Sequence, residues 1–214
     1  MKKVALTLVL LMGLGTSFAQ TAKDVFMQTE YQYTWLGIDF SHAKFIGDFA
    51  NFGDAGEKGP VAIKDEYFDR WNNLILNEST KYNVAGMVRK EDIEYETSTV
   101  ESINAGTVVE DMEDKPVELS KSDVQKFVNS YEFETKEGIG MFFVCEYMNK
   151  IKAEAVYHVV IMRMDTKEIL LHSRETGAAG GFGLRNYWAK TYYNVIEQVR
   201  KKTYNRWKKA NKTK

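Results

Sequence analysis

Three histidines, one cysteine and one glycine-rich run are the residues of this sequence whose types could support chemistry. They are His42, His158, His172, Cys145 and Gly177–Gly183. A histidine can bind a metal ion or transfer a proton near neutral pH, and a cysteine thiolate can act as a nucleophile. Glycines between a strand and a helix can hold a phosphate group. Whether any of this chemistry is possible depends on the elements that position these residues.

Two of the histidines lie on consecutive predicted strands, His158 on Ala153–Met164 and His172 on Glu168–Glu175. If a tight turn joins these strands, His158 lies opposite Glu175 and the two histidines point to opposite faces of the sheet. A shift of one residue would place both on one face, but about four residues and roughly 13 Å apart. We therefore expect no shared metal ion, and the sequence predicts neither a metal site nor a cofactor.

The cysteine lies in an apolar run, directly after Phe142, Phe143 and Val144, which is typical of a buried strand. A reactive thiolate needs an electropositive, partly open setting and a nearby base, and the local sequence supplies neither. Because Cys145 is the single cysteine, it cannot form an intramolecular disulfide. No Gly-x-Ser-x-Gly motif occurs either. We predict an inert thiol and assign no catalytic residue.

The glycine-rich run has the place of a phosphate loop but not its sequence. It lacks the Gly-Lys-Ser/Thr ending of a nucleoside-triphosphate loop and the Gly-x-Gly-x-x-Gly spacing of a dinucleotide site. A structural turn and a contact loop for a partner remain as alternatives. Aromatic residues and arginine concentrate binding energy at interfaces, so the candidate contact residues are Gly180, Gly181, Phe182, Arg185 and Tyr187.

The elements around these residues are clearest in the second half of the chain. Gly138–Asn149, Ala153–Met164 and Glu168–Glu175 are rich in Val, Ile, Tyr and Phe and are separated by short polar joints, which predicts an antiparallel meander. From Leu184 to Lys209, apolar residues recur at steps of three and four, which predicts one long helix packed on the sheet. Its stripe consists of Trp188, Tyr192, Val195, Ile196, Val199 and Thr203.

The first half of the mature chain predicts a strand over Tyr33–His42, a loop over Phe45–Gly59, and a helix from Pro60 to about Ser79. The buried stripe of this helix is expected at Tyr67, Phe68, Trp71, Leu74 and Ile75.

Further along, Lys81–Arg89 and Ile93–Ile103 have the alternation of strands, Gly106–Leu119 is an acidic loop, and Ser120 is a good cap for a short helix. Its apolar face is Val124, Phe127, Val128 and Tyr131. This order predicts an α+β fold, with helices packed on a mixed, mainly antiparallel sheet.

The first nineteen residues have the pattern of a secretory signal peptide. Lys2 and Lys3 precede an apolar run over Val4–Leu14, and Ser17-Phe18-Ala19 places small residues where a signal peptidase reads. This apolar run is well short of the ~20 residues that span a bilayer. We expect residues 1–19 to be removed and residues 20–214 to form one domain, periplasmic or secreted. Intact-mass measurement of the exported protein checks this.

Net charge argues against a general nucleic-acid binder. The chain has 29 basic and 30 acidic residues, and loss of two lysines with the signal leaves a formal charge of about −3. The last fifteen residues differ, because they hold eight basic residues and no acid: Arg200, Lys201, Lys202, Arg206, Lys208, Lys209, Lys212 and Lys214. Such a run is a solvated helix end that complements the helix dipole, or a contact with an anionic surface such as lipid headgroups.

Three short segments carry a resemblance to a family. The run Leu36–Phe40 (LGIDF), the run Tyr82–Arg89 after a helix, and Asp165–Leu170 at the turn of the meander resemble bacterial envelope domains. These domains are those of the curli-secretion channel, the penicillin-binding-protein activator lipoproteins and the amino-terminal domain of the Tol translocation protein. The chain departs from the pattern at Lys167, where glycine is usual, and in having no lipid-bearing cysteine. The resemblance implies an accessory or assembly protein of the cell envelope, with no catalytic residue to carry over.

Two classes of function follow. The first is an exported, non-catalytic envelope protein that binds or assembles with another envelope component, or with itself. The second is a periplasmic small-molecule-binding protein or hydrolase that uses a cleft near Asp39, with carboxylates from the acidic loop. An enclosed pocket with convergent acids would favour the second class, and an exposed aromatic loop the first.

Overall fold

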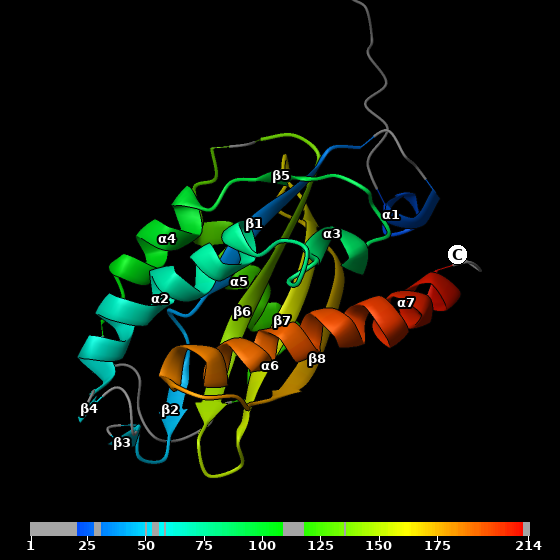
Figure 1. Cartoon of the computed structure of the whole chain (residues 1–214). Helices are drawn as coiled ribbons and strands as arrows, with labels where there is room; N and C mark the ends of the chain where they lie inside the picture. Colours follow the sequence, from blue (N-terminus) through cyan, green and yellow to red (C-terminus); the bar gives the residue numbers. More distant parts are fainter. Residues whose placement is uncertain are drawn as a thin grey trace, which may run out of the picture.

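A mixed sheet forms the centre of the computed structural model in Figure 1. The structure describes residues 21–27, 31–49, 51–52, 56–57, 59–108, 118–134 and 136–211. Within them the main sheet has six strands in the order β5-β1-β6-β7-β8, with β2 also paired to β6. The strands are β1 (Tyr33–Asp39), β2 (Lys44–Ile46), β5 (Glu94–Tyr95), β6 (Ile139–Asn149), β7 (Glu154–Arg163) and β8 (Ile169–Ala178). A separate two-stranded sheet pairs β3 (Asn51–Phe52) with β4 (Gly56–Glu57).

The longest ladders are antiparallel and run from β6 through β7 to β8. The shorter ladders are parallel and join β1 to β5, β1 to β6, and β2 to β6. The predicted α+β class and the three-strand meander are therefore confirmed.

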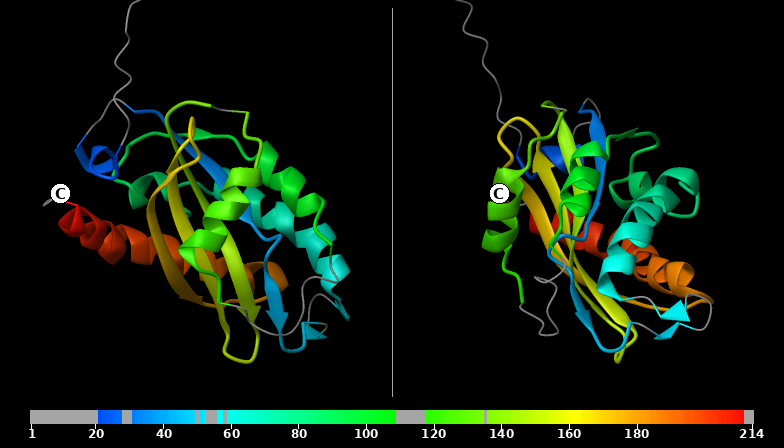
Figure 2. Two further views of the ribbon diagram at one scale, coloured as in Figure 1. Left: turned by 180° about the vertical axis from the view of Figure 1, so that it is seen from behind. Right: turned by 90° about the vertical axis from the view of Figure 1, so that its left-hand side faces the viewer.

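Helices pack on both faces of this sheet (Figure 2). They are α1 (Asp24–Met27), α2 (Pro60–Asn77), α3 (Val84–Met87), α4 (Ser98–Ala105), α5 (Lys121–Ser130), α6 (Leu184–Gln198), the π-helical turn η2 (Val199–Thr203) and α7 (Tyr204–Ala210). Helices α2 and α6 cover one face, while α5 and the inner side of α4 cover the other. Two apolar cores result, with the sheet between them.

The larger core contains the buried stripes predicted for α2 and α6, and all of the predicted stripe residues are buried. Trp188 of α6 stacks on Phe49 with ring centroids 5.0 Å apart, and Phe40 stacks on Phe68 of α2 at 4.8 Å. Helix α6 approaches β8 so closely that a Cβ atom at Gly177 would lie 2.0 Å from the carbonyl oxygen of Thr191. One glycine of the glycine-rich run therefore serves helix–sheet packing.

Strand β5 pairs with only part of the outer edge of β1. Further along this edge, side chains from two helices make hydrogen bonds to the backbone of β1 and of the residue after it. Asn72 of α2 accepts from the Ile38 N–H at 2.6 Å and donates to the Ile38 carbonyl at 3.0 Å. Asn104 of α4 accepts from the Phe40 N–H at 2.7 Å and donates to the same carbonyl of Ile38 at 2.9 Å. These amides replace a neighbouring strand and satisfy buried backbone groups at the edge of the sheet.

The C-terminal helix contains a wider turn in its middle, because η2 interrupts α6 and α7 with π-helical hydrogen bonding. A regular α-helix has about 3.6 residues per turn, so a row of residues four positions apart gradually turns around the helix axis. In an uninterrupted helix, Trp207 would therefore point away from the sheet. With η2 in place, Val199, Thr203 and Trp207 all remain buried. Thr203 also donates to the buried Glu175 carboxylate of β8 at 2.7 Å, and Arg206 does so at 3.0 Å.

One predicted strand is wrong, and a second is right over only two residues. In Lys81–Arg89, the Asn83 side chain accepts from the Gly86 N–H at 2.6 Å and caps the short helix α3. A local side-chain bond to the backbone therefore prevails over the strand-like alternation. In Ile93–Ile103, only Glu94–Tyr95 pairs with β1, and α4 follows from Ser98.

The predicted loop Phe45–Gly59 is also only partly right, because it contains the short strands β2, β3 and β4. By contrast, α2 and α5 begin as predicted, at Pro60 and after Ser120. Ser120 and Asp123 form a reciprocal capping box at the start of α5.

None of the helices in the described ranges is long and apolar enough to cross a membrane. The predicted signal peptide, residues 1–19, and most of the predicted acidic loop, residues 109–117, lie outside the described residues.

Candidate functional site

The glycine-rich run leaves β8 and leads into α6, and the candidate contact residues differ sharply in exposure. The Phe182 side chain is 85% exposed. Tyr187 is partly buried, packs against the larger core and meets Trp188 edge-on, with ring centroids 5.2 Å apart. Phe182 therefore points to solvent, while Tyr187 helps to attach the start of α6 to the sheet.

Hydrogen bonds hold the turn in one conformation. The Gly180 N–H donates to the Tyr187 carbonyl at 3.1 Å, and the Asn186 side chain donates to the Phe182 carbonyl at 3.2 Å. The indole N–H of Trp71 in α2 donates to the Arg185 carbonyl at 3.0 Å. Gly181 has a φ of 102°, which favours glycine at this position. The exposed phenyl ring is thus carried by an ordered turn.

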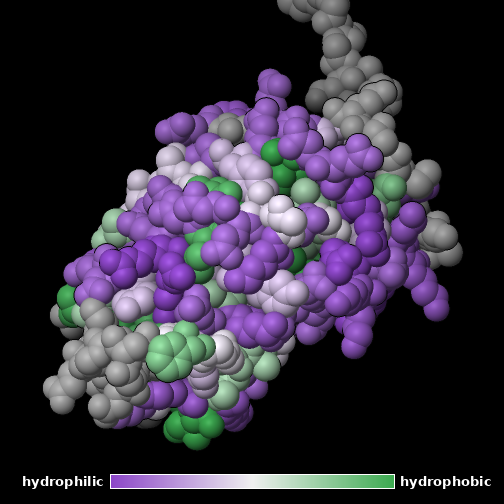
Figure 3. All heavy atoms as spheres, viewed as in Figure 1, coloured by the Kyte–Doolittle hydropathy of each residue, from purple (hydrophilic) through white to green (hydrophobic). Residues whose placement is uncertain are grey.

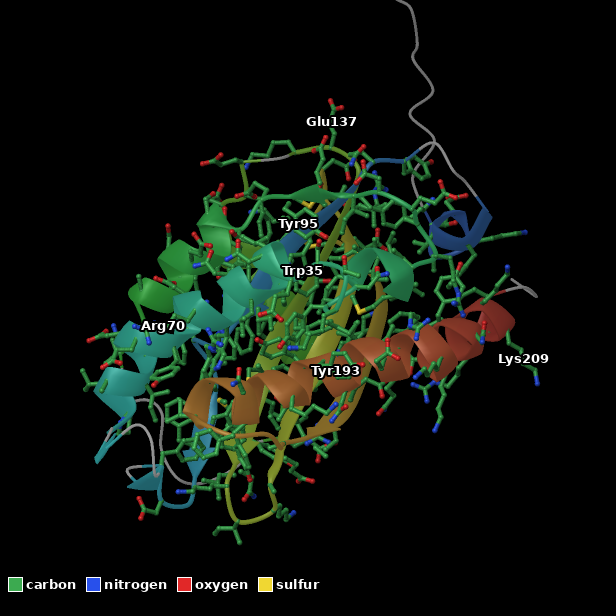
Figure 4. All side chains as sticks on the ribbon, in the orientation of Figure 1. Trp35, Arg70, Tyr95, Glu137, Tyr193 and Lys209 are labelled. Carbon is green, nitrogen blue, oxygen red and sulfur yellow. The ribbon has the colours of Figure 1, made fainter. Side chains whose placement is uncertain are left out.

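A hollow of about 330 Å³ lies beside the turn. Tyr193 of α6, labelled in Figure 4, lies on its wall. The ammonium of Lys190 lies 4.2 Å from the Tyr193 ring centroid, and that of Lys81 lies 4.7 Å from the Tyr82 ring centroid. The complete lining is Lys81, Tyr82, Gly180, Gly181, Asn186, Lys190 and Tyr193. An exposed aromatic ring next to a hollow with aromatic walls is the kind of surface on which a partner can bind.

The second predicted centre of chemistry, Asp39, is fully buried at the end of β1. One carboxylate oxygen accepts from the Ser41 N–H at 2.7 Å, and the other accepts from the Tyr131 hydroxyl. Burial, with the adjacent carboxylate, raises the pKa of Tyr131. His42 Nε2 lies 3.9 Å from Asp39 Oδ2. The carboxylate of Asp39 therefore fixes local structure and is enclosed by protein.

A hollow lined in part by Tyr131 does not include Asp39 in its wall. Its volume is about 340 Å³ and its lining comes from α4 and the end of α5, namely Ser98, Thr99, Ser102, Ile103, Ser130, Tyr131, Glu132 and Glu134. The ring of His42 stacks on Phe127 of α5, with centroids 3.6 Å apart, and burial lowers the pKa of His42.

A third cluster, which was not expected from the sequence, lies across β6, β7 and β8. His158 Nε2 donates to Glu146 Oε2 at 2.7 Å, and His158 Nδ1 lies 2.8 Å from His172 Nε2. Arg174 makes two bonds to the same carboxylate, at 2.9 and 2.6 Å. The Leu119 N–H donates to it at 3.2 Å. Glu146 and His158 are both buried.

Opposing effects determine the ionisation of Glu146. Burial disfavours its charged form, but hydrogen bonds from Arg174 and His158 outweigh burial and lower its pKa to about 2. The pKa of His172 is lowered to about 4 by burial, and further by neighbouring His158 and Lys121. At neutral pH the cluster therefore contains an ionised Glu146 and a neutral His172.

A hydrogen bond links the two histidine rings. When both are neutral, His158 donates from Nε2 to Glu146, so its Nδ1 accepts the Nε2–H of His172. The hydrogen-bonded chain therefore connects side chains of β6, β7 and β8 with the backbone just before α5.

The expected separation of the two histidines is wrong. His158 lies opposite Arg174, and His172 lies opposite Val160. The rings are thus diagonal neighbours on one face, within reach of aromatic side chains. A register shift between Ile161 and Met162 changes the pairing that the turn alone suggested. Glu146 was missed, although a carboxylate within an apolar strand signals a buried charge that needs a partner.

This pair of nitrogens does not form a metal site. Two imidazole nitrogens on one tetrahedral zinc lie about 3.3 Å apart, whereas these lie 2.8 Å apart and Glu146 contacts the other nitrogen of His158. Within the described ranges, no group of three or more histidine, cysteine, aspartate or glutamate residues is placed to hold a metal ion.

Cys145 is buried on β6, and burial raises the pKa of its thiol well above the ordinary value. Its setting is that of a core residue, as the apolar run indicated.

Comparison of the chain with protein families, with curated proteins and with solved structures found no match.

Proposed function

We propose that this protein is an exported, non-catalytic component of the cell envelope that binds another envelope component through the Gly177–Gly183 turn. The observation that carries the proposal is the Phe182 side chain, 85% exposed on a hydrogen-bonded turn beside a hollow. A large exposed apolar side chain on an ordered turn can be buried by a partner with little loss of conformational entropy. Arg185, Gly180 and Gly181 belong to the same surface.

Export is supported by the N-terminal sequence, with two lysines, an apolar run and small residues before Gln20. The resemblance of three segments to bacterial envelope domains supports the same compartment.

The absence of catalysis is supported by where the reactive side chains lie. Asp39, Cys145 and His158 are all fully buried. The carboxylate of Asp39 is occupied by Tyr131 and Ser41. A hydrolase needs an acid, base or nucleophile that reaches its substrate, so the alternative of a hydrolase or small-molecule site at Asp39 has less support than a contact surface.

Site-specific photo-cross-linking tests the proposal. A photoreactive phenylalanine analogue replaces Phe182, the protein is irradiated in its native envelope fraction, and adducts are identified by mass. The partner is then purified and titrated against the wild type and Phe182→Ala. We expect a discrete adduct and at least a tenfold weaker affinity for the variant, as for an interface residue that contributes more than ~1.4 kcal/mol.

The matched control is Ile151, which lies in the turn between β6 and β7 and is 80% exposed. The same photoreactive residue at position 151 should give no adduct with that partner, and Ile151→Ala should bind it with unchanged affinity. Equal cross-linking from both positions, or unchanged affinity of Phe182→Ala, would refute the contact role of the turn.

A further inference from the structure

Helix α7 protrudes beyond the sheet at one end of the molecule (Figure 1), and hydrophilic residues cover this end in Figure 3. Many of the residues of α7 and the segments next to it are basic. We call this region the basic end; its residues are Arg89, Arg200, Lys201, Lys202, Arg206, Lys208 and Lys209. Arg89 comes from the segment after α3, donates to the Arg200 carbonyl at 2.9 Å, and lies over the Tyr204 ring. The tertiary structure therefore extends a cluster that the sequence places only in the last residues.

Two carboxylates neutralise only part of this charge. Glu197 pairs with Arg200 at 2.8 Å and with Lys201 at 2.6 Å. The buried Glu175 pairs with Arg206 at 3.0 Å. Over the described ranges, no ion pair joins Lys202, Lys208 or Lys209 to an acid, and the Lys209 side chain projects away from the protein in Figure 4. A net positive surface of several charges results.

The apolar side of α7 is already used by the protein. Tyr204 and Trp207 are buried, and the Trp207 indole donates to the His172 carbonyl at 3.3 Å. The helix therefore presents charge without an exposed apolar stripe for insertion or aromatic rings for stacking on bases. This surface suits a broad, anionic and fluid target better than a single-stranded nucleic acid, whose bases stack on aromatic side chains.

A second described element, the N-terminal helix α1, also lies at this end of the molecule. Helix α1 packs on α7, with the Phe26 and Tyr204 ring centroids 5.4 Å apart. The first described residues of the chain therefore lie beside the basic end.

We propose that the basic end binds the surface of a membrane rich in anionic lipid, by charge attraction and without insertion. Each lysine or arginine near such a surface adds a favourable increment to binding, and clusters of four to eight basic residues are typical of segments that bind anionic lipid. This surface lies apart from the hollow beside Gly180 and Gly181, so it is a second contact and goes beyond the proposed function.

Vesicle co-sedimentation tests the inference. The mature chain is mixed with vesicles of phosphatidylglycerol and phosphatidylcholine in equal parts, or of phosphatidylcholine alone. One triple variant carries Lys202→Glu, Lys208→Glu and Lys209→Glu. The matched control carries Lys126→Glu, Lys136→Glu and Lys152→Glu, all exposed lysines away from the basic end whose replacement changes the net charge equally.

The wild type and the control should bind the anionic vesicles and not the neutral ones. The basic-end variant should bind roughly 100-fold more weakly, and about 1 M salt should release the wild type. Equal losses in both triple variants, or no binding by the wild type, would overturn the inference. Binding to polyglutamate, an acidic polypeptide, is measured as well. If the basic-end variant no longer bound polyglutamate but still bound the vesicles, the target would be an acidic polypeptide, and the inference would also be overturned. Phe182→Ala should bind vesicles normally, which separates this test from that of the turn.

Discussion

His158 and His172 share a hydrogen bond of 2.8 Å between Nδ1 and Nε2, although they lie on separate strands and are not directly opposed in the ladder. The register shift near the start of β8 makes them diagonal neighbours. One end of the pair is fixed by Glu146 at 2.7 Å. The hydrogen bond between the histidines therefore links β7 to β8, and Glu146 extends the link to β6.

The pH dependence of stability follows from His172, whose pKa is about 4 in the folded protein against 6.5 for an unperturbed histidine. Between these values the unfolded chain binds more protons, so the free energy of unfolding should fall as pH falls from 6.5 to 4. In His172→Gln this fall should be smaller. Denaturant titrations across this range measure it, and an NMR titration of the His172 ring with a midpoint near 6.5 would contradict it.

Glu146 acts in a lower window, because its pKa is about 2 in the fold against 4.5 for an unperturbed glutamate. Its contribution is complete above pH 4.5 and is lost as pH falls towards 2. Glu146→Gln should therefore lower the free energy of unfolding at pH 7 by about 3 kcal/mol. This is the lower end of the range for a broken buried pair, since Arg174 is partly exposed.

Asp165→Asn is the control for Glu146→Gln. Asp165 also accepts two bonds from one arginine, Arg163, but its side chain is 48% exposed. Because water screens such a pair, Asp165→Asn should lower the free energy of unfolding by less than about 1 kcal/mol. Similar losses in both variants would show that burial is not what makes the Glu146 cluster important.

Removing the Asn72 side-chain amide, which hydrogen-bonds to the backbone of β1, should also lower the free energy of unfolding. Asn72→Ala leaves the buried N–H of Ile38 without its acceptor, and we expect a loss of about 2–3 kcal/mol. Asn83→Ala, which removes an exposed helix cap, should cost only about 1 kcal/mol. Chemical denaturation of the two variants under the same conditions provides the comparison.

Trp188 and Phe182 should respond oppositely to truncation. Trp188 is fully buried against Phe49, so Trp188→Ala should destabilise by about 3–5 kcal/mol. Phe182→Ala should change stability by less than ~1 kcal/mol, as exposed substitutions usually do. Thermal melts decide between these expectations, and unfolding caused by Phe182→Ala would make the turn structural rather than a contact.

The thiol of Cys145 should be protected by the fold. It is buried and its pKa is raised by burial, so alkylation at neutral pH should be slow in the native protein and rapid in denaturant. Mass spectrometry over time measures both rates. Rapid labelling of the native state would contradict the assignment of Cys145 as a core residue.

Sequence alone was sufficient for elements whose signals are local and consistent. The meander, the stripes of α2 and α6, the proline that begins α2 and the Ser120 cap each combine periodicity with a start signal, and the structure confirms them. The exposed Phe182 could also be anticipated, because a phenylalanine among glycines has no apolar neighbours in sequence to cover it.

Tertiary structure decided everything that depends on register or on contacts between distant segments. Lys81–Arg89 alternates like a strand, but a single cap from Asn83 forms a helix there. Asn72 and Asn104 complete β1 from helices far along the chain. The Glu146–His158–His172 chain depends on a register shift between β7 and β8. Local propensity reports on neighbours within a few residues, whereas a one-residue change in strand pairing alters which side chains meet, so only the packed sheet could reveal the cluster.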